Sequence, residues 1–75
     1  MKEILKFAIK GIKTEIDERE KTIAKGRQFI RQIENGEKLK TKMTISEIRE
    51  IISQKQQEIE ELDRKRFDYE WQLNN

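Results

Sequence analysis

The chain has 75 residues, of which 43 % are charged and 33 % hydrophobic, and its net charge is only +2 because seventeen basic residues nearly balance fifteen acidic ones. It contains no cysteine and no histidine, which excludes disulfides, thiolate zinc sites and the commonest general base. The proline-free composition, rich in Lys, Glu and Ile, is typical of long helices and coiled coils.

The first half of the chain carries a heptad pattern. Its apolar residues recur at alternating spacings of four and three, as they do along the seam of a coiled coil. The seam positions are Leu5, Ile9, Ile12, Ile16, Arg19, Ile23, Gly26, Ile30 and Ile33. Only Arg19 and Gly26 interrupt the apolar series. We therefore expect a helix over about residues 2–35.

A break follows in the stretch ENGEKLKTKMTISE, residues 34–47. Asn35 and Gly36 form a good helix stop, because glycine adopts the left-handed conformation without a steric penalty. At the other side, Thr44 and Glu47 have the spacing of a capping box, which marks the start of a helix. The break is therefore interpreted as a turn between two helices, over about residues 36–43.

The second half repeats the alternation of four and three over about residues 45–73. Its seam positions are Ile45, Ile48, Ile52, Lys55, Ile59, Leu62, Arg66, Tyr69 and Leu73. If the chain folds back on itself, Ile33 faces Ile45 near the turn. The same register opposes Gly26 to Ile52 and Arg19 to Ile59. At the other end Leu5 faces Leu73, and apolar residues are opposed along most of the ladder.

The predicted fold class is all-α: an antiparallel two-helix coiled-coil hairpin that makes residues 1–75 a single domain. At a rise of 1.5 Å per residue, the rod is roughly 45 to 50 Å long. Charged residues beside the seam suggest the ion pairs Lys6–Glu70, Lys13–Asp63 and Glu15–Lys65, against one repulsive pair, Arg27–Arg49. Each exposed pair contributes only a few tenths of a kcal/mol, so these charges select the register more than they add stability.

A single hairpin of this size has little stability of its own. A chain this short covers only about 60 % of its unfolded surface on folding. Two hairpins packed together bury what one cannot, and twofold assemblies are the commonest. We therefore expect a homodimer in which two hairpins pair into a four-helix bundle.

Large apolar residues outside the seam are candidate contacts with a second copy or with a different protein. They are Phe29 and Ile51 near the turn, and Ile4, Phe7, Phe67 and Trp71 where the two chain ends meet. Trp and Phe are enriched among residues that anchor interfaces. An alternative for Phe67 and Trp71 is that they fold over the frayed end of the hairpin and protect it.

Lysines provide a second kind of candidate surface. The possible phosphate contacts are Lys2 and Lys10 on the first helix, and Lys38, Lys40 and Lys42 in the turn. Such clusters can bind nucleic acid. Neighbouring glutamates reduce the local positive charge of both clusters. The turn also has no aromatic residue on which a base could stack.

No residues suggest catalysis. A two-helix rod lacks the concave interior of an active site, and the carboxylates of residues 58–63 point to different faces of a helix, so we expect no cofactor and no metal. Gly11 and Gly26 belong to no phosphate-binding pattern, because no strand precedes either one.

The sequence therefore favours a non-enzymatic protein–protein interaction module, a small self-associating hairpin that acts as a regulator or an assembly adaptor. The alternative is a nucleic-acid-binding hairpin that uses the lysines. The first fifteen residues lack the continuous apolar core of a signal peptide or a membrane span, so we expect a cytoplasmic protein that does not bind membranes. Its composition favours a small bacterial or phage-type protein.

Overall fold

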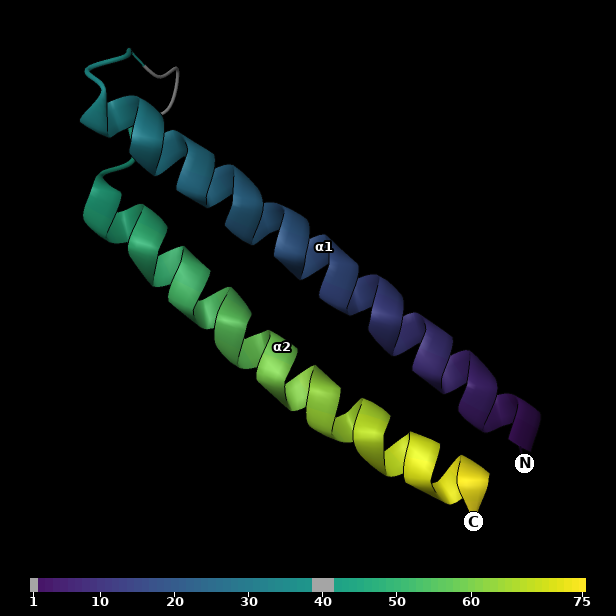
Figure 1. Cartoon of the computed structure of the whole chain (residues 1–75). Coiled ribbons are helices and arrows are strands. Elements are labelled where there is room, and N and C mark those ends of the chain that lie inside the picture. The colour runs from purple at the N-terminus through teal and green to yellow at the C-terminus, as the bar shows by residue number, and fades with distance from the viewer. Residues whose placement is uncertain (1, 39–41) are drawn as a thin grey trace.

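A computed structural model describes residues 2–38 and 42–75 and shows two long helices. Helix α1 runs Lys2–Glu34 and helix α2 runs Ile45–Asn74. The helices lie side by side in opposite directions, so both chain ends lie at one end of the rod and the turn at the other (Figure 1). The molecule measures 53 × 16 × 15 Å. The predicted all-α helical hairpin is confirmed.

Helix α1 ends in a hydrogen-bonded glycine motif. Gly36 has a φ of 77°, in the left-handed region that favours glycine. Its N–H donates to the carbonyl of Ile33 at 3.0 Å, and the N–H of Glu37 donates to the carbonyl of Gln32 at 2.9 Å. These two bonds form a Schellman motif, which satisfies carbonyl groups that the end of a helix leaves without partners.

Thr44 caps the start of helix α2. Its hydroxyl oxygen accepts a hydrogen bond from the N–H of Glu47 at 3.2 Å, and the hydroxyl donates to Oε1 of Glu47 at 3.2 Å. The first bond satisfies one of the free amides of the first turn, so the helix begins at Ile45. The Glu47 carboxylate thus contacts the hydroxyl, whereas a full capping box would place it on the backbone N–H of Thr44.

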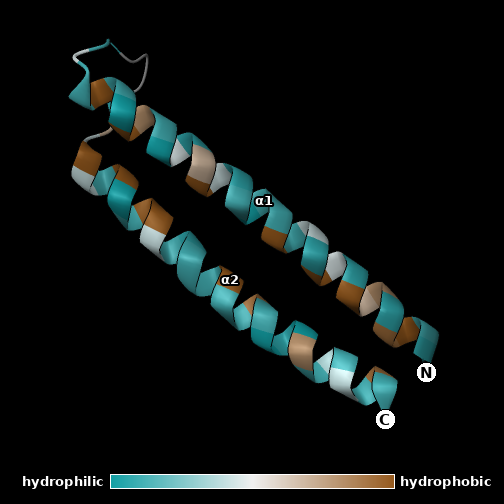
Figure 2. Cartoon of the chain, in the orientation of Figure 1, coloured by the Kyte–Doolittle hydropathy of each residue, from teal (hydrophilic) through white to brown (hydrophobic). Residues whose placement is uncertain are grey.

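The core is a single layer of isoleucines between the helices. In Figure 2 most hydrophobic residues form short patches on the sides where the two helices face each other. The buried residues are Ile9, Ile12, Ile16, Ile23, Ile48 and Ile52. Even these keep 3 to 9 % of their surface exposed, and no described side chain falls below 2 %. The rod therefore has a packed seam but no enclosed interior.

Contacts around Gly26 define the register of the two helices. A Cβ atom on Gly26 would lie 3.1 Å from Cγ1 of Ile52 and 3.3 Å from Cγ2 of Ile48. Gly26 therefore faces Ile52, as predicted, and its missing side chain lets the helices approach closely. Ile23 packs in the same cluster as Ile48 and Ile52.

The predicted ion pairs beside the seam are wrong. Among residues 2–38 and 42–75, none of the three expected pairs comes within 4.0 Å. Instead Asp63 binds Arg66 on its own helix at 3.1 Å, and Arg49, expected to face Arg27, lies 4.0 Å from Glu34. A long exposed charged side chain can reach several partners of opposite charge, and the ion pairs it can form have similar energies. The register set by the apolar contacts therefore does not determine which ion pairs form.

Candidate functional site

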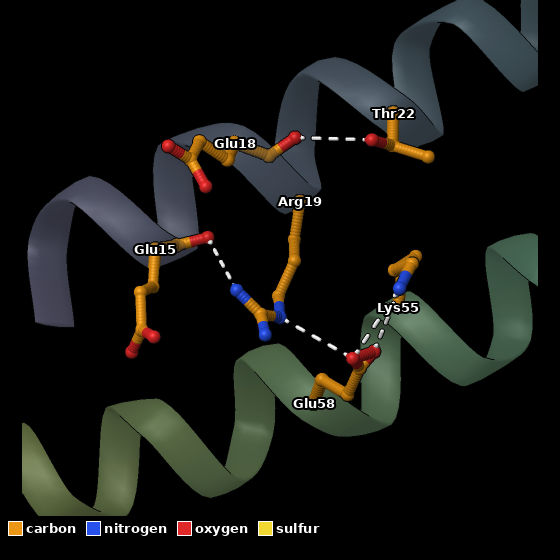
Figure 3. A network of polar contacts seen from close by, with 6 residues as sticks. All are labelled: Glu15, Glu18, Arg19, Thr22, Lys55 and Glu58. Carbon is orange, nitrogen blue, oxygen red and sulfur yellow. Dashed lines mark hydrogen bonds and ion pairs between the residues drawn. The ribbon is translucent and has the colours of Figure 1, made fainter.

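A polar layer interrupts the apolar seam halfway along the rod. Figure 3 shows its side chains between the two helices. Nε of Arg19 on α1 lies 3.4 Å from Oε1 of Glu58 on α2. Nζ of Lys55 donates to both carboxylate oxygens of Glu58, at 3.1 and 3.3 Å. Nη1 of Arg19 also donates to the backbone carbonyl of Glu15 at 3.1 Å. Glu58 thus lies between two cations, one from each helix.

These cations change the acidity of Glu58. The hydrogen bond from Lys55, together with the positive charges of Lys55 and Arg19, lowers the pKa of the Glu58 carboxyl below its ordinary value of 4.5, although partial burial opposes the shift. The side chain is 35 % exposed, so solvent weakens the attraction. Glu58 therefore stays ionised at neutral pH and links the two helices.

The two arginines at seam positions carry an energetic cost. Nε of Arg19 and Nε of Arg66 are both buried without a hydrogen-bond acceptor. The contact of Arg19 Nε with Glu58 has the distance of an ion pair but not the geometry of a hydrogen bond. A buried donor without an acceptor costs about 1–3 kcal/mol, so the two arginines offset part of the stability that the isoleucines contribute.

The acidic run of helix α2 does not form a metal centre. Within the described part of the chain, no group of three or more Asp, Glu, His or Cys residues is placed to hold a metal ion. Two carboxylates of this run form ion pairs with basic side chains instead: Glu58 contacts Lys55, and Asp63 contacts Arg66. In the same described residues, neither helix has an apolar stretch long enough to cross a membrane.

The open end of the rod carries four large exposed apolar side chains. Their exposed fractions are 70 % for Ile4, 75 % for Phe7, 67 % for Phe67 and 62 % for Trp71. Phe7 and Trp71 occupy the outermost heptad positions of their helices, so they point away from the seam on opposite sides of the rod. From their heptad positions we expect the four residues to surround the open end rather than to form one continuous patch. Their exposure does not favour the alternative in which Phe67 and Trp71 cover the end of the seam.

A shallow groove lies beside the seam near the turn, and we call it the turn-end groove. Helix α1 contributes Thr22, Lys25, Gly26 and Phe29 to its lining, and Met43, Ile48 and Ile51 come from the other side. The structure thus brings the half-buried Phe29 and Ile51 to one surface. Nζ of Lys25 lies 5.7 Å from the centroid of the Phe29 ring, a favourable cation–π distance.

The lysines lie on two separate parts of the surface. Lys2 and Lys10 are exposed on α1, and Lys38 and Lys42 are exposed in the turn, whereas Lys40 lies outside the described residues. Lys10 shares a shallow surface with Glu3, so this side of α1 carries both signs of charge.

Comparison of the chain with protein-family models, curated proteins and solved structures gives no match. The residues that sequence reasoning missed are those of the polar layer. The signal was available, because Glu58 follows Lys55 by three residues, one turn along the helix, and directly precedes Ile59, the residue that faces Arg19 in the predicted register.

Proposed function

We propose that this chain is a non-enzymatic protein–protein interaction module, a hairpin that self-associates and presents its open end to a different protein as a regulator or an assembly adaptor. The observation that carries the proposal is the exposed surface. The chain exposes 6309 Å², whereas a compact folded monomer of 9.1 kDa exposes about 4,900 Å². The excess, on the order of 1,400 Å², is larger than the roughly 800 Å² that each partner buries in a standard interface.

Packing within one hairpin supports the same proposal. The helices bury six isoleucines, and all six keep some contact with solvent. Pairing two hairpins converts the seam into the interior of a four-helix bundle, where these residues can lose their remaining exposure. A twofold homodimer achieves this with the simplest closed symmetry.

The open end supports the proposal of a protein partner. Phe7, Phe67 and Trp71 expose most of their aromatic surface there, and large rings of this kind supply much of the binding energy at protein interfaces. A partner with an apolar groove or an amphipathic helix would cover them. The absence of histidine and cysteine from the sequence supports a non-enzymatic role.

A nucleic-acid-binding hairpin is the second candidate. The observation in its favour is the exposure of Lys38 and Lys42 at the turn and of Lys2 and Lys10 on α1. Phosphate contacts release counterions, so their affinity falls steeply as salt is added. Apolar contacts lose little under the same change, which separates the two candidates.

Sedimentation equilibrium over a range of protein concentrations, at low and high salt, tests the proposed function. We expect a species of twice the chain mass of 9.1 kDa whose dissociation constant changes little with salt. A chain that is monomeric at every concentration would contradict self-association. Strong, salt-sensitive binding of a short RNA or DNA duplex by that monomer would favour the second candidate.

A double variant tests the open end separately. Phe67→Ala with Trp71→Ala removes two exposed rings that do not line the turn-end groove. We expect this variant to remain a dimer, because the open end is proposed to bind a different protein. A monomeric double variant with unchanged helix content would assign the open end to self-association.

A further inference from the structure

We propose that a second copy of this chain covers the turn-end groove, so that the groove of one hairpin packs on the groove of the other about a twofold axis. The inference rests on the proposed self-association and assigns it to one surface. The groove lies between Phe29 on α1 and Ile51 on α2, beside the close approach at Gly26. Three observations support this location: charge, apolar lining and area.

Charge makes the turn-end groove the least costly surface to dehydrate. Of its seven lining residues only Lys25 is charged. Other shallow surfaces of the described rod are more highly charged: one is lined by Lys6, Lys10, Lys13 and Glu70 with two apolar residues, and another by Lys13, Asp17, Glu20, Asp63 and Arg66 with Ile16. Removing charged groups from water is costly, whereas removing apolar groups from water is favourable, so contact between copies is favoured at the groove.

The groove is also self-complementary. Phe29 and Ile51 line it from the two helices, and its lining also includes Gly26, which has no side chain, and Ile48, which is only 3 % exposed. In a twofold contact the same patch is present on both copies, so these apolar groups meet apolar groups. Lys25 does not prevent the contact, because its long stem can carry the ammonium group to the rim while the methylene groups stay packed.

The available area fits a dimer that extends from the groove along the rod. A rod of 53 × 16 Å presents a face of about 850 Å² in projection, close to the roughly 800 Å² that each partner of a standard interface buries. The isolated hairpin exposes roughly 1,400 Å² more than a compact monomer of the same mass. Covering one such face would bury more than half of this additional surface.

Two threonines of helix α1 provide a matched test. Thr14 and Thr22 are both exposed, and each hydroxyl donates to the carbonyl four residues earlier, at 3.1 Å to Lys10 and 3.2 Å to Glu18. Thr22 lines the turn-end groove, whereas Thr14 occupies the outermost heptad position. Replacing either residue with Arg adds the same volume and charge, removes the same kind of bond and raises the helix propensity equally.

We expect Thr22→Arg to weaken dimerisation about tenfold or more, because the added side chain occupies space that the second copy needs. Thr14→Arg should change the dissociation constant less than about twofold, as surface substitutions usually do. Sedimentation equilibrium measures both constants, and circular dichroism verifies that both variants are helical. Equal effects of the two substitutions, or a larger effect of Thr14→Arg, would overturn the proposed location.

Single cysteines give a second measurement without added bulk. Because the chain has no cysteine, Thr22→Cys and Thr14→Cys each create one thiol that a maleimide can modify. The thiol at position 22 should react more slowly as the protein is concentrated, whereas the thiol at position 14 should react at a constant rate. If the protein dimerises but both thiols stay equally reactive, the groove is not the contact surface, although self-association still holds. A monomer at every concentration overturns both.

Discussion

The turn end and the open end of the rod differ in how the two helices contribute to the core. Near the turn, buried residues come from both helices, with Ile23 on α1 packed against Ile48 and Ile52 on α2. Toward the open end only α1 contributes buried residues, because the α2 positions from Ile59 to Leu73 are at most half-buried. We therefore expect the turn end to be the more stable of the two, whereas the open end carries exposed aromatic side chains.

Truncation of one isoleucine should show the largest difference between the ends. Ile48→Ala removes a side chain that is only 3 % exposed, and we expect a loss of about 3 kcal/mol, within the usual range for a buried isoleucine. Leu73→Ala at the half-buried open end should cost about 1 kcal/mol. Urea denaturation at one fixed protein concentration measures both values. Equal losses would mean that the seam is uniformly stable.

The two helical glycines should respond in opposite directions to the same substitution. A Cβ at Gly26 would lie 3.1 Å from Cγ1 of Ile52, an atom close to the backbone that cannot easily move away. We expect Gly26→Ala to destabilise the hairpin by about 1 kcal/mol despite its better helix propensity.

Gly11→Ala is the control for the open half. No atom lies within 4 Å of an added Cβ at Gly11, so this substitution should stabilise the hairpin by about 1 kcal/mol. Thermal denaturation of both variants provides the comparison. Stabilisation by Gly26→Ala would show that close approach of the helices is not required near the turn.

Acidification should weaken the polar layer between the two halves. Because the pKa of Glu58 is lowered in the folded chain, its stabilising effect is complete above the ordinary value of 4.5. The effect is lost as the pH falls through the lower folded-state pKa. We expect wild-type stability to decrease more than that of Glu58→Gln over this range, measured by urea denaturation at several pH values. Parallel pH profiles would show that the contacts of Glu58 with Arg19 and Lys55 contribute nothing.

The smallest effect is expected for the exposed ion pair beside the turn. Arg49 lies 4.0 Å from Glu34, and both side chains are more than half exposed. Arg49→Gln should therefore change the free energy of unfolding by less than about 0.5 kcal/mol. A loss comparable to that of Ile48→Ala would contradict the view that apolar contacts stabilise the turn end.

The sequence predicted the hairpin because its signals are strong and local. Gly36 has one conformational role, Thr44 caps one helix, and the apolar alternation opposes Gly26 to Ile52 in only one register. The partners of charged residues were not predictable from the same pattern. Asp63, for example, binds Arg66 on its own helix rather than Lys13 across the seam, because several neighbours are within reach of a long side chain.

The heptad pattern also bears on the candidate contact residues. Phe29 and Ile51 occupy matching heptad positions, and they line one groove. Phe7 and Trp71 are both exposed near the chain ends, and because both occupy outermost heptad positions, we expect them to point in opposite directions. The number of a residue in the chain tells which end of the rod it lies near. Its heptad position tells in which direction its side chain points.

The most direct test of the account is the dependence of unfolding on protein concentration. If a second copy covers the surface that one hairpin leaves exposed, folding and association are linked by mass action. The urea midpoint of the wild-type chain should then rise steadily as the protein is concentrated, and the rise should be smaller for Thr22→Arg. A midpoint that is independent of concentration over a hundredfold range would show that the hairpin folds alone and would contradict the account.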